Sequence, residues 1–284
     1  MSRSGPHSVG TAASRYFRYG YHPNNSRLQY ARWAITLPVR SRMGAAAIAR
    51  ATRGPQPESW LQDFAGKRAL IVGSGPSLDK VDDTFFDGFD PVIYINFALN
   101  RARHKGSEYF FTTDSGPIRE YIDKKGNADD FARLGPQRCI YAPVFQDQWQ
   151  GFTPEGRALL TWIGCDAAAW CSQKVRLGPL SLPLVLRYAP RQPDWSDFTL
   201  PAPGLRQPVL DHTSALSAVL FAAVNGAREI GLIGCDFSAG RALAAGSDQP
   251  DPGTIFSGAA AELGRMAETL KHQGIAVVNH SWTV

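Results

Sequence analysis

Residues 68–78 read Arg-Ala-Leu-Ile-Val-Gly-Ser-Gly-Pro-Ser-Leu, and the fold is decided by this stretch. The run Ala69–Val72 is wholly apolar, which is typical of a strand that is buried on both faces of a parallel sheet. Gly73 and Gly75 follow at once, where the chain leaves the strand, turns tightly and brings its backbone close to a ligand. The stretch therefore predicts the first strand and the first turn of an α/β domain.

The residues after the turn favour the start of a helix. Pro76 suits a first helical turn, because its φ is already helical and its missing N–H is not needed there. Ser77 would then place a hydroxyl and a backbone N–H at the positive end of the helix, and such an arrangement predicts a phosphate site. Leu78 stands where the standard dinucleotide fingerprint has its third glycine, so a purely structural turn is the alternative.

Composition narrows the class of protein. A chain of 284 residues with 44% apolar and 19% charged residues suits one large α/β domain or two small ones. No segment approaches the roughly 20 consecutive apolar residues of a membrane span, and no secretory signal peptide is visible. The four cysteines show neither C-x-x-C nor zinc-type spacing. We therefore expect free thiols, no metal site and a cytoplasmic location.

Charge is distributed unevenly along the chain. The first 53 residues carry nine arginines, no lysine and no acidic residue, so they hold +9 while the whole chain holds +5. We interpret residues 1–57 as a basic extension, partly helical or disordered, before a domain over residues 58–284. Its charge favours peripheral contact with an anionic membrane at the inner membrane face, and no nucleic acid is expected. The alternatives are a solvated extension, a segment that packs on the domain and an organellar presequence.

Polar residues end the next predicted strands. Residues 91–96 form a strand that ends in Asn96, and residues 108–113 form one that is followed by Asp114. Open α/β sheets present ligand residues at the carboxyl ends of such strands. Asn96 would bond a ribose hydroxyl or a base edge, or cap the following helix. Asp114 would serve as a general base, a ribose ligand or an N-cap.

The middle of the chain is the least regular. Residues 146–210 are rich in tryptophan and proline, and they predict an insertion or lid over the sheet. A helix follows over residues 213–227. Thr213 and Ser214 open this helix, where they would hold a phosphate or carboxylate, or simply cap the helix.

The last third of the chain adds two strands and a helix. Residues 230–236 predict a strand that ends in Asp236, which would bind hydroxyl groups. Residues 259–273 predict a helix and residues 275–279 a last strand, with His280 at its end.

These pieces occur together in an order that resembles a known family. The residues that carry the resemblance are Gly73-Ser-Gly-Pro-Ser-Leu78, Asn96, His212-Thr-Ser-Ala215 and Ile233-Gly-Cys-Asp-Phe237. The chain resembles the bacterial CMP-sialic-acid-dependent sialyltransferases, and the related group that holds flagellin-modifying glycosyltransferases and the archaeal 6-hydroxymethylpterin diphosphokinase. The resemblance covers about residues 68–100 and 211–237, and more weakly residues 259–284.

The resemblance implies a role for each matching residue. It places Gly73, Ser74 and Gly75, with Pro76 and Ser77 beside them, near the nucleotide phosphate. It places Asn96 near the sugar or base of the nucleotide, Thr213 and Ser214 near the anionic groups of the donor, and Asp236 near the ribose.

The chain also departs from the family. Ser74 replaces an asparagine and Ala215 a glycine, and residues 238–271 hold no histidine where the family has its catalytic base. Asp114 or His280 would then be the base, or the chemistry differs.

We therefore expect an α/β, Rossmann-like domain with a mostly parallel sheet. The expected function is transfer of a sugar, including a sialic-acid-like one, from a nucleotide-activated donor to a glycan or protein acceptor, with no cofactor. One alternative is a pterin-type diphosphokinase that uses ATP and Mg²⁺. Another is a catalytically inactive nucleotide-binding or membrane-associated protein of the same fold.

Overall fold

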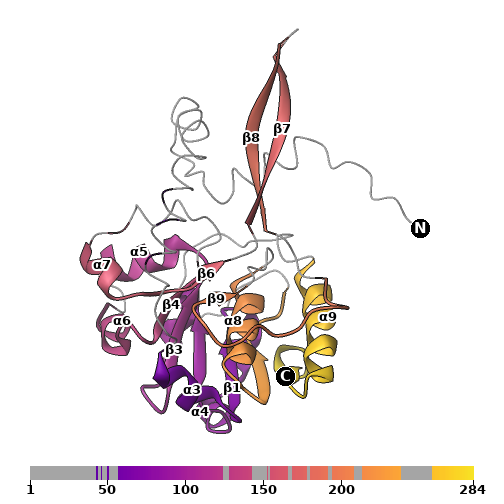
Figure 1. The fold of residues 1–284 in the computed structure, drawn as a ribbon. Coiled ribbons are helices and arrows are strands. Elements are labelled where there is room, and N and C mark those ends of the chain that lie inside the picture. The colour runs from indigo at the N-terminus through magenta and orange to yellow at the C-terminus, as the bar shows by residue number, and fades with distance from the viewer. Residues whose placement is uncertain are drawn as a thin grey trace.

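The computed structural model describes residues 43, 46, 50, 57–123, 128–142, 152, 154–165, 168–177, 180–190, 194–207, 213–237 and 258–284 (Figure 1). Nearly all of the basic extension lies outside these residues, so its contact with a membrane stays a prediction. His212 also lies outside them. Among the described helices, none is both long and apolar enough to cross a membrane.

A seven-stranded sheet forms the centre of the domain, and all its strands run parallel. Its strands are β1 (Arg68–Val72), β2 (Val92–Ile95), β3 (Glu108–Thr112), β4 (Cys139–Tyr141), β5 (Thr161–Trp162), β10 (Glu229–Ile233) and β11 (Ala276–Asn279). The order across the sheet is β11-β10-β1-β2-β3-β4-β5. This confirms the predicted α/β, Rossmann-like fold.

The strand order reverses between β1 and β10. The chain moves outward from β1 to β5, returns to pair β10 with the free side of β1, and ends in β11. In open α/β sheets, ligands bind in the crevice outside the carboxyl ends of the strands at such a reversal. By this rule the fold predicts a ligand site where Gly73 and Gly75 leave β1 and where Asp236 follows β10.

Both faces of the sheet are covered, as the continuous apolar strands predict. Alternate residues of β1 enter two separate cores: Ala69 and Ile71 face one, Leu70 and Val72 the other. The first core is completed by α3 (Glu58–Phe64), α8 (Ser214–Val224) and α9 (Ala259–His272). The second is completed by η1 (Pro76–Lys80), α4 (Asp83–Phe86), η2 (Asn96–Arg101), α5 (Ser115–Asp123) and α6 (Ala128–Leu134).

The stretch 146–210, predicted as an insertion or lid, contributes to several parts of the structure. It contains α7 (Pro154–Ala158) and supplies β5 as the edge strand of the main sheet. Trp195 is buried in the first core, where its indole N–H donates to the carboxylate of Glu262. The stretch also forms the small pair β6 (Gly164–Cys165) and β9 (Arg206–Gln207), and the hairpin β7 (Ala168–Leu177) and β8 (Leu180–Pro190), which stands away from the sheet (Figure 1). The role of a lid remains a prediction.

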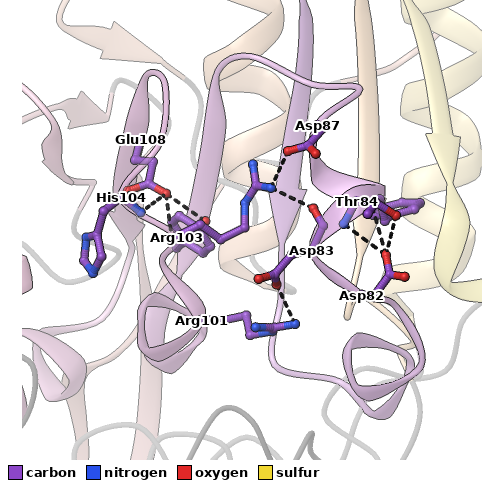
Figure 2. Close-up of polar contacts among 10 residues, drawn as sticks. Asp82, Asp83, Thr84, Asp87, Arg101, Arg103, His104 and Glu108 are labelled. Atoms are coloured by element: carbon purple, nitrogen blue, oxygen red, sulfur yellow. Dashed lines mark hydrogen bonds and ion pairs between the residues drawn. The ribbon is translucent and has the colours of Figure 1, made fainter.

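A buried carboxylate organises the amino ends of β2 and β3. Glu108 is 2% exposed, and it accepts hydrogen bonds from the backbone N–H groups of Arg103 and His104 at 2.9 and 3.0 Å (Figure 2). The hydroxyl of Tyr94 donates to the same carboxylate at 3.1 Å. Arg103 in turn donates to the carboxylate of Asp87 at 2.8 Å. This network ties together the segments at the amino ends of these strands, opposite to the carboxyl ends where Gly73 and Asp236 lie.

Candidate functional site

The glycine turn after β1 packs against the end of β10. The backbone N–H of Gly73 donates to the carbonyl of Ile233 at 2.8 Å, and that of Gly75 donates to the carbonyl of Gly234 at 2.7 Å. A Cβ on Gly73 would lie 2.3 Å from the oxygen of Gly234, which is too close for any side chain. The close backbone approach that the glycines predicted is thus observed, and it is an approach to the neighbouring strand end.

Asp236 lies at the start of η1. Its carboxylate accepts a hydrogen bond from the hydroxyl of Ser77 at 2.8 Å, and the backbone N–H of Ser77 lies 3.2 and 3.3 Å from its two oxygens. The Ser77 hydroxyl also accepts a hydrogen bond from the N–H of Gly234 at 3.0 Å. Pro76 is the first residue of η1, as its ring predicted, and Ser74 is half-buried. The hydroxyl and the N–H of Ser77, which the sequence predicted for a phosphate, are therefore bonded to a carboxylate of the chain itself.

Asn96 is held at the carboxyl end of β2 by its neighbour β3. Its φ of 52° is in the left-handed region, which asparagine tolerates better than most residues. Thr112 donates to the side-chain oxygen of Asn96 at 2.6 Å, and Tyr121 donates to its carbonyl at 3.1 Å. The carboxamide does not cap η2. Its NH₂ group has no partner among the described residues and can donate to a ligand.

The start of α8 is joined to the end of β3. The hydroxyls of Thr113 and Ser214 are hydrogen-bonded at 2.7 Å, and both side chains are buried. Thr213 is the N-cap, because its side-chain oxygen accepts a hydrogen bond from the N–H of Ala215 at 3.2 Å. This confirms the capping role that the sequence left open for Thr213, and it brings the positive end of α8 next to the chain at Asp114.

Asp114 follows Thr113 at this same edge and is half-buried. Burial in the protein disfavours its charged form and raises its pKa from 3.8 to about 6. No donor among the described residues bonds its carboxylate, whereas its backbone N–H donates to the hydroxyl of Thr112 at 3.0 Å. A carboxylate that is ionised at neutral pH, yet accepts a proton readily, has the property that a general base requires.

His280 lies apart from these residues. Its ring packs edge-on against Phe85 and Phe89, with centroid distances of 5.3 and 5.8 Å, and its Cδ2 lies close to Gly231 in the middle of β10. Burial lowers the pKa of the imidazole, and its Nε2 has no partner in the described part of the chain. These contacts are those of a packing residue, and none of them involves the carboxyl edge.

Two supporting residues were not singled out from the sequence. The hydroxyl of Ser281 accepts a hydrogen bond from the N–H of Cys235 at 2.9 Å, and the side chain of Asn279 donates to the carbonyl of Cys235 at 3.0 Å. Together they hold the turn that carries Asp236. The signal in the sequence is the run of polar residues, Asn279 to Ser281, at the end of the last strand.

Asp114 and Asp236 supply carboxylates at the carboxyl edge, but no group of three or more histidine, cysteine, aspartate or glutamate side chains suited to a metal ion occurs among the residues that the structure describes. Comparison with protein-family models finds no match, and a search of curated proteins finds none either.

Proposed function

We propose that the crevice along the carboxyl ends of β10, β1, β2 and β3 binds a nucleotide-activated sugar and transfers the sugar to a hydroxyl group of a glycan or protein acceptor. The observation that carries this proposal is the position of Asp114. A carboxyl group with a pKa of about 6 lies next to the start of an 11-residue helix, because Thr113 is hydrogen-bonded to Ser214.

This pair of features suits the reaction. The acceptor hydroxyl forms a bond to the anomeric carbon of the donor while the bond from that carbon to the phosphate oxygen breaks. Asp114 takes the proton of the acceptor hydroxyl, and the leaving nucleotide gains negative charge. The positive end of α8 lies where that charge would be stabilised.

The carboxyl ends of the strands from β10 to β3 together have the length and the polar groups that binding of a nucleoside requires. Three strand spacings separate β10 from β3, which amounts to about 14 Å. Over that distance lie the carboxylate of Asp236 and the NH₂ group of Asn96, and these can bond ribose hydroxyls and a base edge. The resemblance in residues 68–100 and 211–237 supports the same ligand class.

Thermal unfolding with CMP, CDP, UDP, GDP and ATP, each with and without Mg²⁺, tests the proposal. A ligand that binds the native state stabilises it by about 2.7 kcal/mol at a hundredfold excess over Kd. We expect a shift with one of the pyrimidine or guanine nucleotides. A shift that requires ATP and Mg²⁺ would favour the pterin-type diphosphokinase, and no shift with any nucleotide would contradict nucleotide binding.

The variant Asp114→Asn separates binding from chemistry. We expect it to keep the nucleotide-induced shift and to lose sugar transfer by about 100-fold or more, the range of general-base catalysis. Asp79→Asn, which removes one exposed carboxylate from η1, is the matched control and should retain both. Full transfer by Asp114→Asn would show that another group is the base.

A further inference from the structure

On the side where its glycines lack side chains, the glycine turn offers no space to a phosphate. A Cβ added to Gly75 would lie 2.2 Å from Oδ2 of Asp236 and 2.7 Å from the oxygen of Gly234. A Cβ on Gly234, whose φ is +67°, would lie 2.1 Å from the oxygen of Gly73. In a phosphate-binding turn the missing side chains leave room for the ligand, whereas here the neighbouring strand end fills that room.

Four donors at the turn are also occupied. The hydroxyl and the N–H of Ser77 both point to Asp236, and the N–H groups of Gly73 and Gly75 point to carbonyls of β10 and its turn. Ser77 is fully buried. Four groups that a phosphate would use are therefore already bonded within the protein.

The negative charge of Asp236 also disfavours a phosphate at the turn. No lysine or arginine in the described part of the chain forms an ion pair with Asp236, and its hydrogen-bond donors among these residues are the hydroxyl and the N–H of Ser77. A phosphate that approached the turn would meet this carboxylate without a cation between them. A hydroxyl group would meet a strong acceptor, because Oδ1 has a single N–H contact at 3.2 Å and Asp236 is half-buried.

We propose that Asp236 closes the glycine turn to phosphate and reserves it for an uncharged, hydroxyl-bearing part of the ligand, such as ribose. Asp236 is thus the residue that sets which end of the ligand lies at the reversal between β1 and β10. The ribose part of this inference rests on the proposed function, whereas the exclusion of phosphate does not.

The test is the variant Asp236→Asn, whose amide oxygen can still accept the hydrogen bonds of Ser77 while the charge is removed. Binding of inorganic phosphate and of cytidine is measured by calorimetry, and unfolding curves verify the fold. We expect phosphate to bind at least about tenfold more tightly than to the wild type, because a like charge has been removed from contact distance. We expect cytidine to bind about tenfold more weakly, because the hydroxyls lose a charged acceptor.

Asp79→Asn is the control, because it removes one exposed carboxylate from the same short helix while Asp236 keeps its charge. It should change both affinities by less than about threefold, as expected for a surface charge. Equal phosphate affinities in Asp236→Asn and Asp79→Asn would overturn the exclusion. A gain for phosphate with unchanged cytidine binding would overturn the ribose assignment alone.

These measurements also distinguish failure of the proposed function from failure of this inference. If the wild type binds neither cytidine nor any nucleotide, nucleotide binding is refuted, while the phosphate arm still tests the exclusion. Should Asp236→Asn not fold, a crystal structure of the wild type with CMP decides. Phosphate oxygens bonded to the N–H groups of residues 73–77 would overturn the inference, and a ribose hydroxyl on Asp236 would support it.

Discussion

Replacing Gly75 by alanine tests the contact between β1 and β10 directly. The backbone of Gly75 has φ −77° and ψ 163°, an extended conformation that alanine adopts without strain. The added methyl group would nevertheless lie 2.2 Å from Oδ2 of Asp236. It would also lie 2.7 Å from the backbone oxygen of Gly234. Any loss of stability must therefore come from the displacement of Asp236 and of the Gly234 carbonyl, and not from the backbone conformation of residue 75.

The size of the loss follows from what Asp236 holds. Its displacement breaks the hydrogen bonds from the hydroxyl and the N–H of Ser77, and a hydrogen bond to a charged group is worth about 1.5–3 kcal/mol. Ser77 is fully buried, so its donors are left without a partner or with water that must enter the core. We expect Gly75→Ala to lower the free energy of unfolding by about 3–5 kcal/mol, a large part of the 5–15 kcal/mol typical of a protein.

Urea unfolding of wild type, Gly75→Ala and Gly264→Ala measures the effect. Gly264 lies within α9, and a Cβ there would meet no atom within 4 Å. The same substitution should raise stability there by about 0.5–1 kcal/mol, because glycine is a poor helix former. A Gly75→Ala protein within about 1 kcal/mol of the wild type would refute the reasoning. In the double variant that combines Gly75→Ala with Asp236→Ala, the loss in the free energy of unfolding should be smaller than the sum of the losses in the two single variants.

Three further outcomes are expected from unfolding measurements. Glu108→Ala should lower the free energy of unfolding by about 3–5 kcal/mol, because the N–H groups of Arg103 and His104 and the hydroxyl of the buried Tyr94 lose their acceptor; a loss below about 1 kcal/mol would contradict the network. Thr213→Ala should cost about 1 kcal/mol through loss of the N-cap of α8, and an unchanged midpoint would argue against that cap. The pKa of Asp114 is about 6 in the folded protein against 3.8 in an unfolded chain, so the unfolded state releases its proton first and stability falls as pH rises from about 4 to 6. Asp114→Asn should remove that fall and be more stable than the wild type at pH 7 by up to about 3 kcal/mol, with no difference near pH 3; a destabilised variant at pH 7 would refute the raised pKa.

Local pattern was enough to predict most strands of the sheet, but not the edge strand β5, which lies in the stretch predicted as an insertion or lid. The apolar run of residues 69–72 is β1, and the strands predicted over residues 91–96 and 108–113 are β2 and β3 with slightly shorter bounds. Parallel strands end at one edge, so the polar residues after them could be placed together. The structure brings Asn96 and Asp114 to that edge through Thr112, which contacts both.

Contacts between residues that are far apart in the sequence could not be predicted from local pattern. Ser77 and Asp236 are 159 residues apart, and nothing near either residue indicates their pairing. The strand predicted over residues 230–236 ends at Ile233 because Gly234 turns with a positive φ toward β1. Likewise, the last strand was expected to deliver His280 to the site, but the ring of His280 enters the packing around Phe85 and Phe89.

The glycine turn shows why one motif allows two interpretations. A G-x-G turn after a buried strand requires a close backbone approach, and a phosphate or a neighbouring strand end can make that approach equally well. The strand that pairs with β1 after the chain reversal decides between them, because its own end meets the same turn. Here that end carries Gly234, which lets the two turns touch, and Asp236, which bonds Ser77. An acid two residues beyond a glycine after a late apolar strand therefore favours a closed turn, since its carboxylate can reach the helix start that a phosphate would otherwise use.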